Sequence, residues 1–214
     1  MKSNMKTKFL ILTLLCCSFV CDAQEFQGEY IYKYQIQASP TMEMSYRTIT
    51  DGRRTKSIVA MMGQEMEVLQ GEDGYSYVIM HAQKMVMKSL HSYPMNPPAN
   101  ALFEGTQCTP LASQNKKKIL GFDCIEYRAQ CKDQEGNQTE VSIWHTHDLL
   151  LPMSQEQVNP IGMKDLPAKG AMLEMVMTRN GGSFTSLKVS EIVPRAVAAE
   201  DFELPKGYQI IEVN

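Results

Sequence analysis

Two histidines on one short segment, His145 and His147, form the pattern in this sequence that is closest to a metal site. On a strand, side chains two residues apart point to the same side and lie about 7 Å apart along the chain. Imidazole nitrogens placed in this way can chelate zinc or copper. Because the sequence offers no identifiable third ligand, we expect no metal and keep His145 and His147 as the alternative.

Methionine is frequent, and several methionines form pairs two residues apart, so that in a strand each pair points to one face. The pairs are Met42 with Met44, Met85 with Met87, and Met175 with Met177. Three interpretations stay open. The thioethers fill gaps in an ordinary core, line an apolar cavity for an acyl chain, or bind a soft metal. No histidine or cysteine closely flanks the pairs, which weighs against copper.

Sequence signatures of enzymes are missing from the chain. It has no Gly-x-Ser-x-Gly nucleophile elbow and no glycine-rich loop of the kind that binds phosphate. Cys124 has no recognisable histidine partner, and Glu65 and Glu67 look like ordinary surface carboxylates on an expected strand. We therefore expect a protein that is not an enzyme, with no catalytic residue and no cofactor.

The start of the chain has the layout of a secretory signal peptide over residues 1–23. Three lysines come first, an apolar run extends from Phe9 to Val20, and Ala23 offers a small residue for cleavage. The apolar run is shorter than the about 20 residues that a membrane span needs. Lipid attachment is disfavoured, because no cysteine there follows a small residue. We expect a periplasmic or extracellular protein without a transmembrane span.

Cleavage would leave 191 residues, which we expect to form one domain over residues 24–214. The net charge would change from −3 to −5, because three lysines and one aspartate leave with the peptide. An acidic chain of this kind does not attract nucleic acid. We interpret its one basic cluster, Lys116 to Lys118, as a solvated loop edge.

Alternation with a period of two dominates the remaining sequence. From Phe26 to Gln37, one side of the expected strand is aromatic and apolar and the other is almost wholly polar. Turn signals such as Asp51-Gly52 and Asp73-Gly74 separate further runs of this kind. About eleven strands are expected, which indicates an antiparallel all-β domain. Residues 93–104 and 148–170 break the pattern and are expected to be loops or short helical lids.

Three cysteines, Cys108, Cys124 and Cys131, follow the expected cleavage site, and an odd number in an oxidising compartment suggests one disulfide and one free thiol. If Ile119 and Leu120 form a two-residue hairpin loop, Cys108 lies directly opposite Cys131, as a disulfide requires. Cys124 is an odd number of residues from Cys131 and therefore faces the other side. We predict a Cys108–Cys131 disulfide and a buried, free Cys124.

Short segments of the chain resemble a known family. Residues 118–127 combine a lysine-ended strand, a glycine turn and a Cys-x-x-Tyr strand, and residues 141–149 and 201–208 follow at matching distances. Together they resemble an uncharacterised family of exported bacterial proteins that is frequent in the Bacteroidota. That family looks similar to the periplasmic lipoprotein carriers and their outer-membrane receptors. The resemblance covers residues 26–212.

The resemblance implies a curved antiparallel half-barrel whose concave apolar face holds acyl chains under lids. It implies a non-enzymatic cell-envelope binding protein, with lipid or lipoprotein acyl chains as ligand and an envelope protein as a possible partner. The expected ligand-lining residues are Tyr30, Tyr32, Tyr34, Met42, Met44, Met85, Met87, Met175 and Met177. Two alternatives remain open, a structural or interaction protein with a filled core and a Met/His metal-binding protein.

Overall fold

The computed structural model describes residues 26–37, 41–61, 64–90, 103, 105–152, 159–167, 169–179 and 182–213. The predicted signal peptide and most of the predicted loop 93–104 lie outside these residues. The strands are β1 (Gly28–Ile36), β2 (Met42–Thr50), β3 (Thr55–Met61), β4 (Gln64–Gln70), β5 (Ser76–Met80), β6 (Met85–Ser89), β7 (Gln107–Leu111), β8 (Lys116–Ile119), β9 (Phe122–Lys132), β10 (Gln138–Thr146), β11 (Ala171–Arg179), β12 (Gly182–Pro194) and β13 (Gln209–Val213). Two 3-10 helices, η1 (His81–Gln83) and η2 (Ala199–Phe202), complete the described elements.

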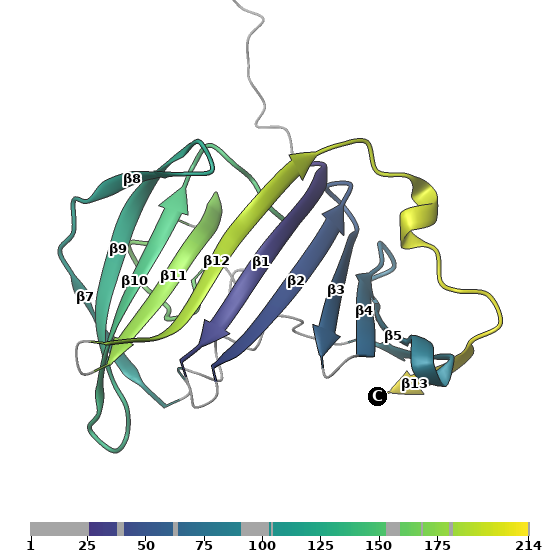
Figure 1. Ribbon diagram of the computed structural model, residues 1–214, viewed down its shortest axis with the longest axis horizontal. Coiled ribbons are helices and arrows are strands. Elements are labelled where there is room, and N and C mark those ends of the chain that lie inside the picture. Colours follow the sequence, from purple (N-terminus) through teal and green to yellow (C-terminus); the bar gives the residue numbers. More distant parts are fainter. Residues whose placement is uncertain are drawn as a thin grey trace, which may run out of the picture.

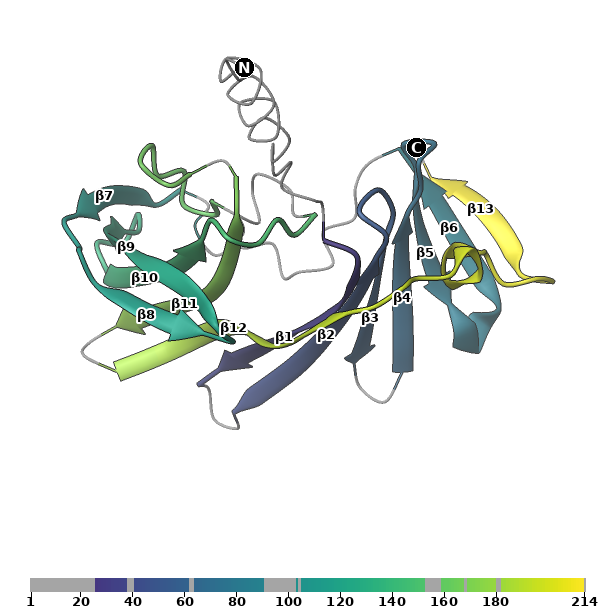
Figure 2. The ribbon, with the colours of Figure 1, turned by 90° about the horizontal axis from the view of Figure 1, so that it is seen from above.

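All of these strands belong to one open, curved sheet (Figure 1). Its order is β13-β6-β5-β4-β3-β2-β1-β12-β11-β10-β9-β7, and β8 adds to β9 beside β7. Seen from above, β7–β11 and β3–β6 rise as two walls on either side of β12, β1 and β2 (Figure 2). The predicted half-barrel of antiparallel strands is therefore confirmed, with one addition, because β13 pairs with β6 in parallel.

Two differences from the expected strands have simple causes. Residues 108–118, expected as one strand, form two strands, β7 and β8. Lys116 to Lys118, which we also interpreted as a loop edge, lie in β8 and pair with β9, and Lys116 and Lys118 stay exposed. β13 is not among the expected strands, because its five residues are all exposed and show no alternation of burial. β13 is held by backbone pairing with β6 rather than by an apolar face, so hydrophobic periodicity does not reveal it.

The sheet has an inner and an outer face, and we call the face that carries Tyr30, Tyr32 and Tyr34 the inner face. These tyrosines share one core cluster with Leu149, Leu151, Met163 and Leu166 from the connection between β10 and β11. That connection, predicted as an irregular loop, therefore packs onto the inner face over β9–β12 (Figure 2). None of the helices formed by the described residues has the length and apolar character that crossing a bilayer requires.

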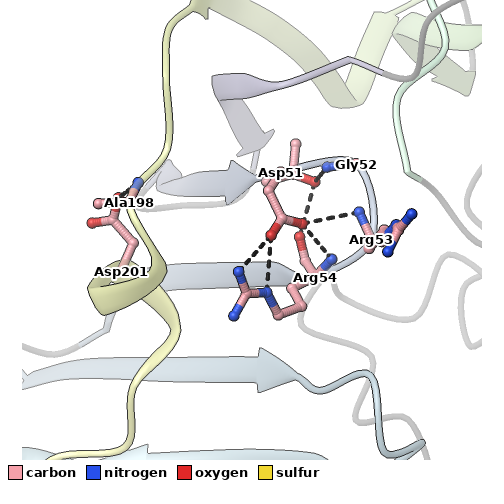
Figure 3. Close-up of polar contacts among 7 residues, drawn as sticks. Asp51, Gly52, Arg53, Arg54, Ala198 and Asp201 are labelled. Carbon is pink, nitrogen blue, oxygen red and sulfur yellow. Dashed lines mark hydrogen bonds and ion pairs between the residues drawn. The ribbon is translucent and has the colours of Figure 1, made fainter.

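A smaller cluster lies on the outer face, where the segment after β12 runs back across the sheet. Phe202 of η2 packs with Ile49 and Leu69, and the Arg54 guanidinium lies 4.3 Å from the centre of its ring. Asp51 organises the β2–β3 turn beneath it by accepting hydrogen bonds from both main-chain and side-chain groups (Figure 3). The packing of Phe202 on the outer face fixes the position of the segment that leads to β13.

The structure contains the predicted Cys108–Cys131 disulfide, and Cys124 is free and buried. The predicted pairing is correct, although the assumed turn is not. The tight turn is formed by Leu120 and Gly121, since Ile119 pairs with Phe122. Residues 112–115 lie between β7 and β8 and belong to neither strand, and this break brings Cys108 back opposite Cys131.

We predict that replacing both bridged cysteines by serine lowers the free energy of unfolding. The disulfide closes a loop with a sequence separation of 23, and loss of that constraint on the unfolded chain costs about 3 kcal/mol. Urea denaturation of the Cys108→Ser/Cys131→Ser variant measures the loss. Reducing agent should destabilise the wild type and leave the double variant unchanged. Equal unfolding midpoints for the oxidised wild type and the variant would contradict the prediction.

Candidate functional site

Cross-strand pairing places all the ligand-lining residues predicted from the sequence on the inner face. Directly opposed residues share a face, so the register can be followed from strand to strand. One row runs through Met85, Met80, Met66, Val59, Tyr46 and Tyr32. A second row runs through Met44, Tyr34, Leu187 and Met175. The remaining predicted residues, Tyr30, Met42, Met87 and Met177, lie two positions along the same strands and so face the same way.

Charge is confined to the outer face in this part of the sheet. Among the described residues of β1–β6, no inward-facing position is an Asp, Glu, Lys or Arg, whereas outward positions include Glu29, Lys33, Arg47, Lys56, Glu67 and Lys88. The inner-face tyrosines are neutral, because burial raises the pKa of Tyr34 and raises that of Tyr46 to about 12. The inner face therefore offers an uncharged surface of thioethers, rings and small hydroxyl groups.

Burial divides the predicted residues into two groups. Tyr30, Tyr32, Tyr34, Met175 and Met177 are at most 4% exposed and belong to the core cluster. The hydroxyl group of Tyr32 donates a hydrogen bond to the main-chain oxygen of Met172 at 2.8 Å, which ties β1 to β11. This packing matches the interpretation of the methionines as core filler.

The other group lies toward β4–β6 and is less buried. Met85 and Met87 are half-buried, as is Met44. Met66 and Met80 are absent from the residues predicted to line the ligand, yet both are half-buried and stand in register with Met85. The pattern of methionine pairs two residues apart does not include Met66 and Met80, because each is a single methionine on its own strand. Met42 is 49% exposed at the start of β2.

A cluster of His81, Glu65 and Glu67 lies on the outer face, with ligand atoms within 4.8 Å of one another. His81 is already engaged, since its Nε2 lies 3.4 Å from Glu67 and its Nδ1 lies 3.0 Å from the Tyr208 hydroxyl group. Lys56 adds a positive charge 3.8 Å from Glu67. The cluster therefore has the character of an ion-pair network that ties η1 to the segment before β13.

His145 lies on the inner face near the end of β10 and is fully buried. Neither ring nitrogen has a hydrogen-bond partner in the part of the chain that the structure describes. Burial, and then the neighbouring His147, lower the pKa of His145 to about 4, so the ring is neutral at physiological pH. The rings of Tyr127 and His147 approach it edge-on, with centroid distances of 6.2 and 5.2 Å.

Gly170 makes room for this histidine. Its φ is +123°, and a Cβ atom built there would overlap the main-chain oxygen of Thr146 and Cε1 of His145. Only glycine combines this backbone conformation with such a close approach. No pattern in the sequence indicates the contact, because 25 residues separate the two positions along the chain.

No family model and no curated protein matches the chain. Solved structures similar to it include an uncharacterised conserved protein from Thermus thermophilus, with a TM-score of 0.47, 11% identity, and coverage of 87% of this chain and 91% of that one. A LolA superfamily protein from Nitrosomonas europaea has a TM-score of 0.40 and 9% identity over 86% and 91% of the two chains. LprF from Mycobacterium bovis has a TM-score of 0.33 and 10% identity over 79% and 89%.

We predict that Gly170→Ala destabilises the protein by about 2 kcal/mol or more. The alanine would strain the backbone at a positive φ, and its Cβ atom would also clash with Thr146 and His145. The matched control is Gly74→Ala, since Gly74 has a φ of +79° and open space around the position of a Cβ. Gly74→Ala should lower the free energy of unfolding by only about 1 kcal/mol, the penalty for alanine at a positive φ. Urea denaturation compares them, and equal losses would show that the contact with His145 does not matter.

Proposed function

We propose that the protein is an exported, non-enzymatic binding protein of the cell envelope that holds a lipid-like or other apolar ligand. The ligand would lie on the inner face over β4–β6. The observation that carries the proposal is the row of Met66, Met80 and Met85, which pair directly with one another across three neighbouring strands and are only half-buried.

The chemistry of this surface suits an acyl chain better than a polar ligand. The row is flanked by Val78, Val68 and Met87 on the same face, and no inward-facing described residue nearby is charged. Each methylene group removed from water contributes about 0.8 kcal/mol. Thioether side chains are flexible and adapt to chains of different length and shape. A cation or an anionic headgroup would find no partner there.

The main alternative, a structural or interaction protein with a filled core, is supported by the packing over β9–β12. Five of the predicted lining residues, on the neighbouring β1 and on β11, are almost completely buried in the core cluster that also contains Leu149, Leu151 and Met163. We therefore place the ligand on the β4–β6 side, and treat Tyr30, Tyr32, Tyr34, Met175 and Met177 as the packed wall beside it.

Export is supported by two independent features. The first is the signal-peptide pattern of residues 1–23, and the second is the Cys108–Cys131 disulfide, which is stable in oxidising compartments. Residues 24–214 would then be the mature domain. An exported protein with an uncharged, thioether-rich surface would serve to shield an apolar molecule from water, with no catalytic step.

We predict that the protein purified from its own cell envelope carries a lipid-like molecule. Native mass spectrometry should show an added mass that disappears after extraction with organic solvent, because extraction removes a non-covalent apolar ligand. A homogeneous protein of the mass of its polypeptide alone, before any extraction, would favour the filled-core alternative.

We also predict that Met80→Lys weakens binding of the neutral apolar dye N-phenylnaphthylamine at least about tenfold. The new ammonium group would have to be desolvated beside the ligand. Met42→Lys makes the same change on the same face at a 49% exposed position and should change the affinity about twofold or less. Fluorescence titration measures both, and circular dichroism checks that they fold. Equal effects of the two variants would place the dye elsewhere.

A further inference from the structure

We propose that His145 and His147 bind a transition-metal ion with a filled d shell, Zn²⁺ or Cu(I), at the end of β10. This site is separate from the proposed apolar ligand surface and would add a second binding activity. The sequence offered the histidine pair only as an alternative, and the structure supplies three observations that favour it.

The first observation is the state of the His145 ring. It is fully buried, and both nitrogens lack a hydrogen-bond partner within the described residues. Leaving a buried polar group without a partner is energetically costly, and such groups are rare in folded proteins. A metal ion bound to one nitrogen would offset this cost. A neutral imidazole is also the form that binds metals.

The second observation is the spacing of the two rings. Their centroids are 5.2 Å apart, with an angle of 73° between the ring planes. An imidazole nitrogen bound at about 2.0 Å puts the ring centre about 3.1 Å from the ion, so two rings at a tetrahedral angle lie about 5 Å apart. A linear arrangement would require about 6 Å. The observed centroid spacing is therefore closer to that of two ligands at a tetrahedral angle, the geometry that Zn²⁺ adopts, than to that of a linear pair.

The third observation is how the surroundings orient the pair. Gly170 lies against one edge of His145, since a Cβ there would overlap Cε1 and lie 2.8 Å from Nε2. Because Gly170 crowds Nε2, we assign Nδ1 of His145 as the nitrogen that would bind the ion. His147 is exposed, so an ion can arrive from solvent at one ligand and be held by the other.

Met172 would distinguish the two ions. It pairs directly opposite His145 on β11 and is 1% exposed. A thioether is a soft ligand that favours Cu(I) over Zn²⁺. If Met172 contributes, Met172→Leu, a nearly volume-conserving change, should weaken Cu(I) binding and leave Zn²⁺ binding unchanged.

The test is calorimetric titration of the chelator-treated mature protein with Zn²⁺. We expect one ion per chain in the wild type. His145→Phe keeps an aromatic ring in the buried space but removes both nitrogens, and His147→Ala changes an exposed residue. Each should weaken Zn²⁺ binding at least about tenfold. Because His147 is exposed, its variant keeps the test valid even if His145→Phe folds poorly.

His81→Ala is the matched control, because His81 belongs to the other histidine and carboxylate cluster and already has two partners. It should bind Zn²⁺ like the wild type. Absorption of Co²⁺ added in place of Zn²⁺ gives an independent readout, since tetrahedral Co²⁺ absorbs strongly and octahedral Co²⁺ weakly. Absence of binding by the wild type, unchanged binding by His145→Phe and His147→Ala, or loss of binding only in His81→Ala would each overturn the proposal.

Discussion

The in-register pairing of β1–β6 is the constraint on which the rest of the structure depends. Because side chains alternate strictly between faces, a slip of one strand by one residue would move all charged side chains of that strand to the other side. The register that is present puts residues such as Glu29, Arg47 and Glu67 outward, where they form ion pairs. The same register lines the inner face with methionine, tyrosine and valine. One property of the backbone thus creates both the charged outer surface and the apolar inner surface.

The two halves of the inner face differ in what covers them. Over β9–β12 the connection between β10 and β11 supplies Leu149, Leu151, Met163 and Leu166, which bury the sheet beneath them. Over β4–β6 the described residues leave the methionine row half-buried. The choice between a filled core and a ligand surface is therefore a matter of position along the sheet. The filled-core interpretation of the methionines applies to the β9–β12 half, and the proposed ligand surface lies on the β4–β6 half.

Sequence patterning predicts the features that depend on local alternation. These are most of the antiparallel strands, the face shared by the tyrosines and methionine pairs, and the Cys108–Cys131 pairing, whereas the half-barrel shape is implied by the family resemblance. Features that depend on long-range contacts lie beyond it. The break at residues 112–115 interrupts the simple ladder that the sequence indicated, whereas the hairpin turn at Leu120 and Gly121 is a local feature that was placed one residue too early. The burial of His145 depends on Gly170 and on a bulge in the β10–β11 ladder after Trp144. No local sequence pattern encodes the contact with Gly170 or the bulge after Trp144.

The parallel strand β13 has a consequence for the order in which the chain assembles. Its contact with β6 joins residues far apart in sequence, as the Lys88–Glu212 ion pair with a separation of 124 shows. Closing so long a loop is entropically costly until the intervening strands have formed. β13 should therefore dock last, guided by Phe202 on the outer face. Until it docks, the edge of β6 has no partner strand among the described residues, and that is the stage at which copies of the partly folded chain are most open to pairing with one another.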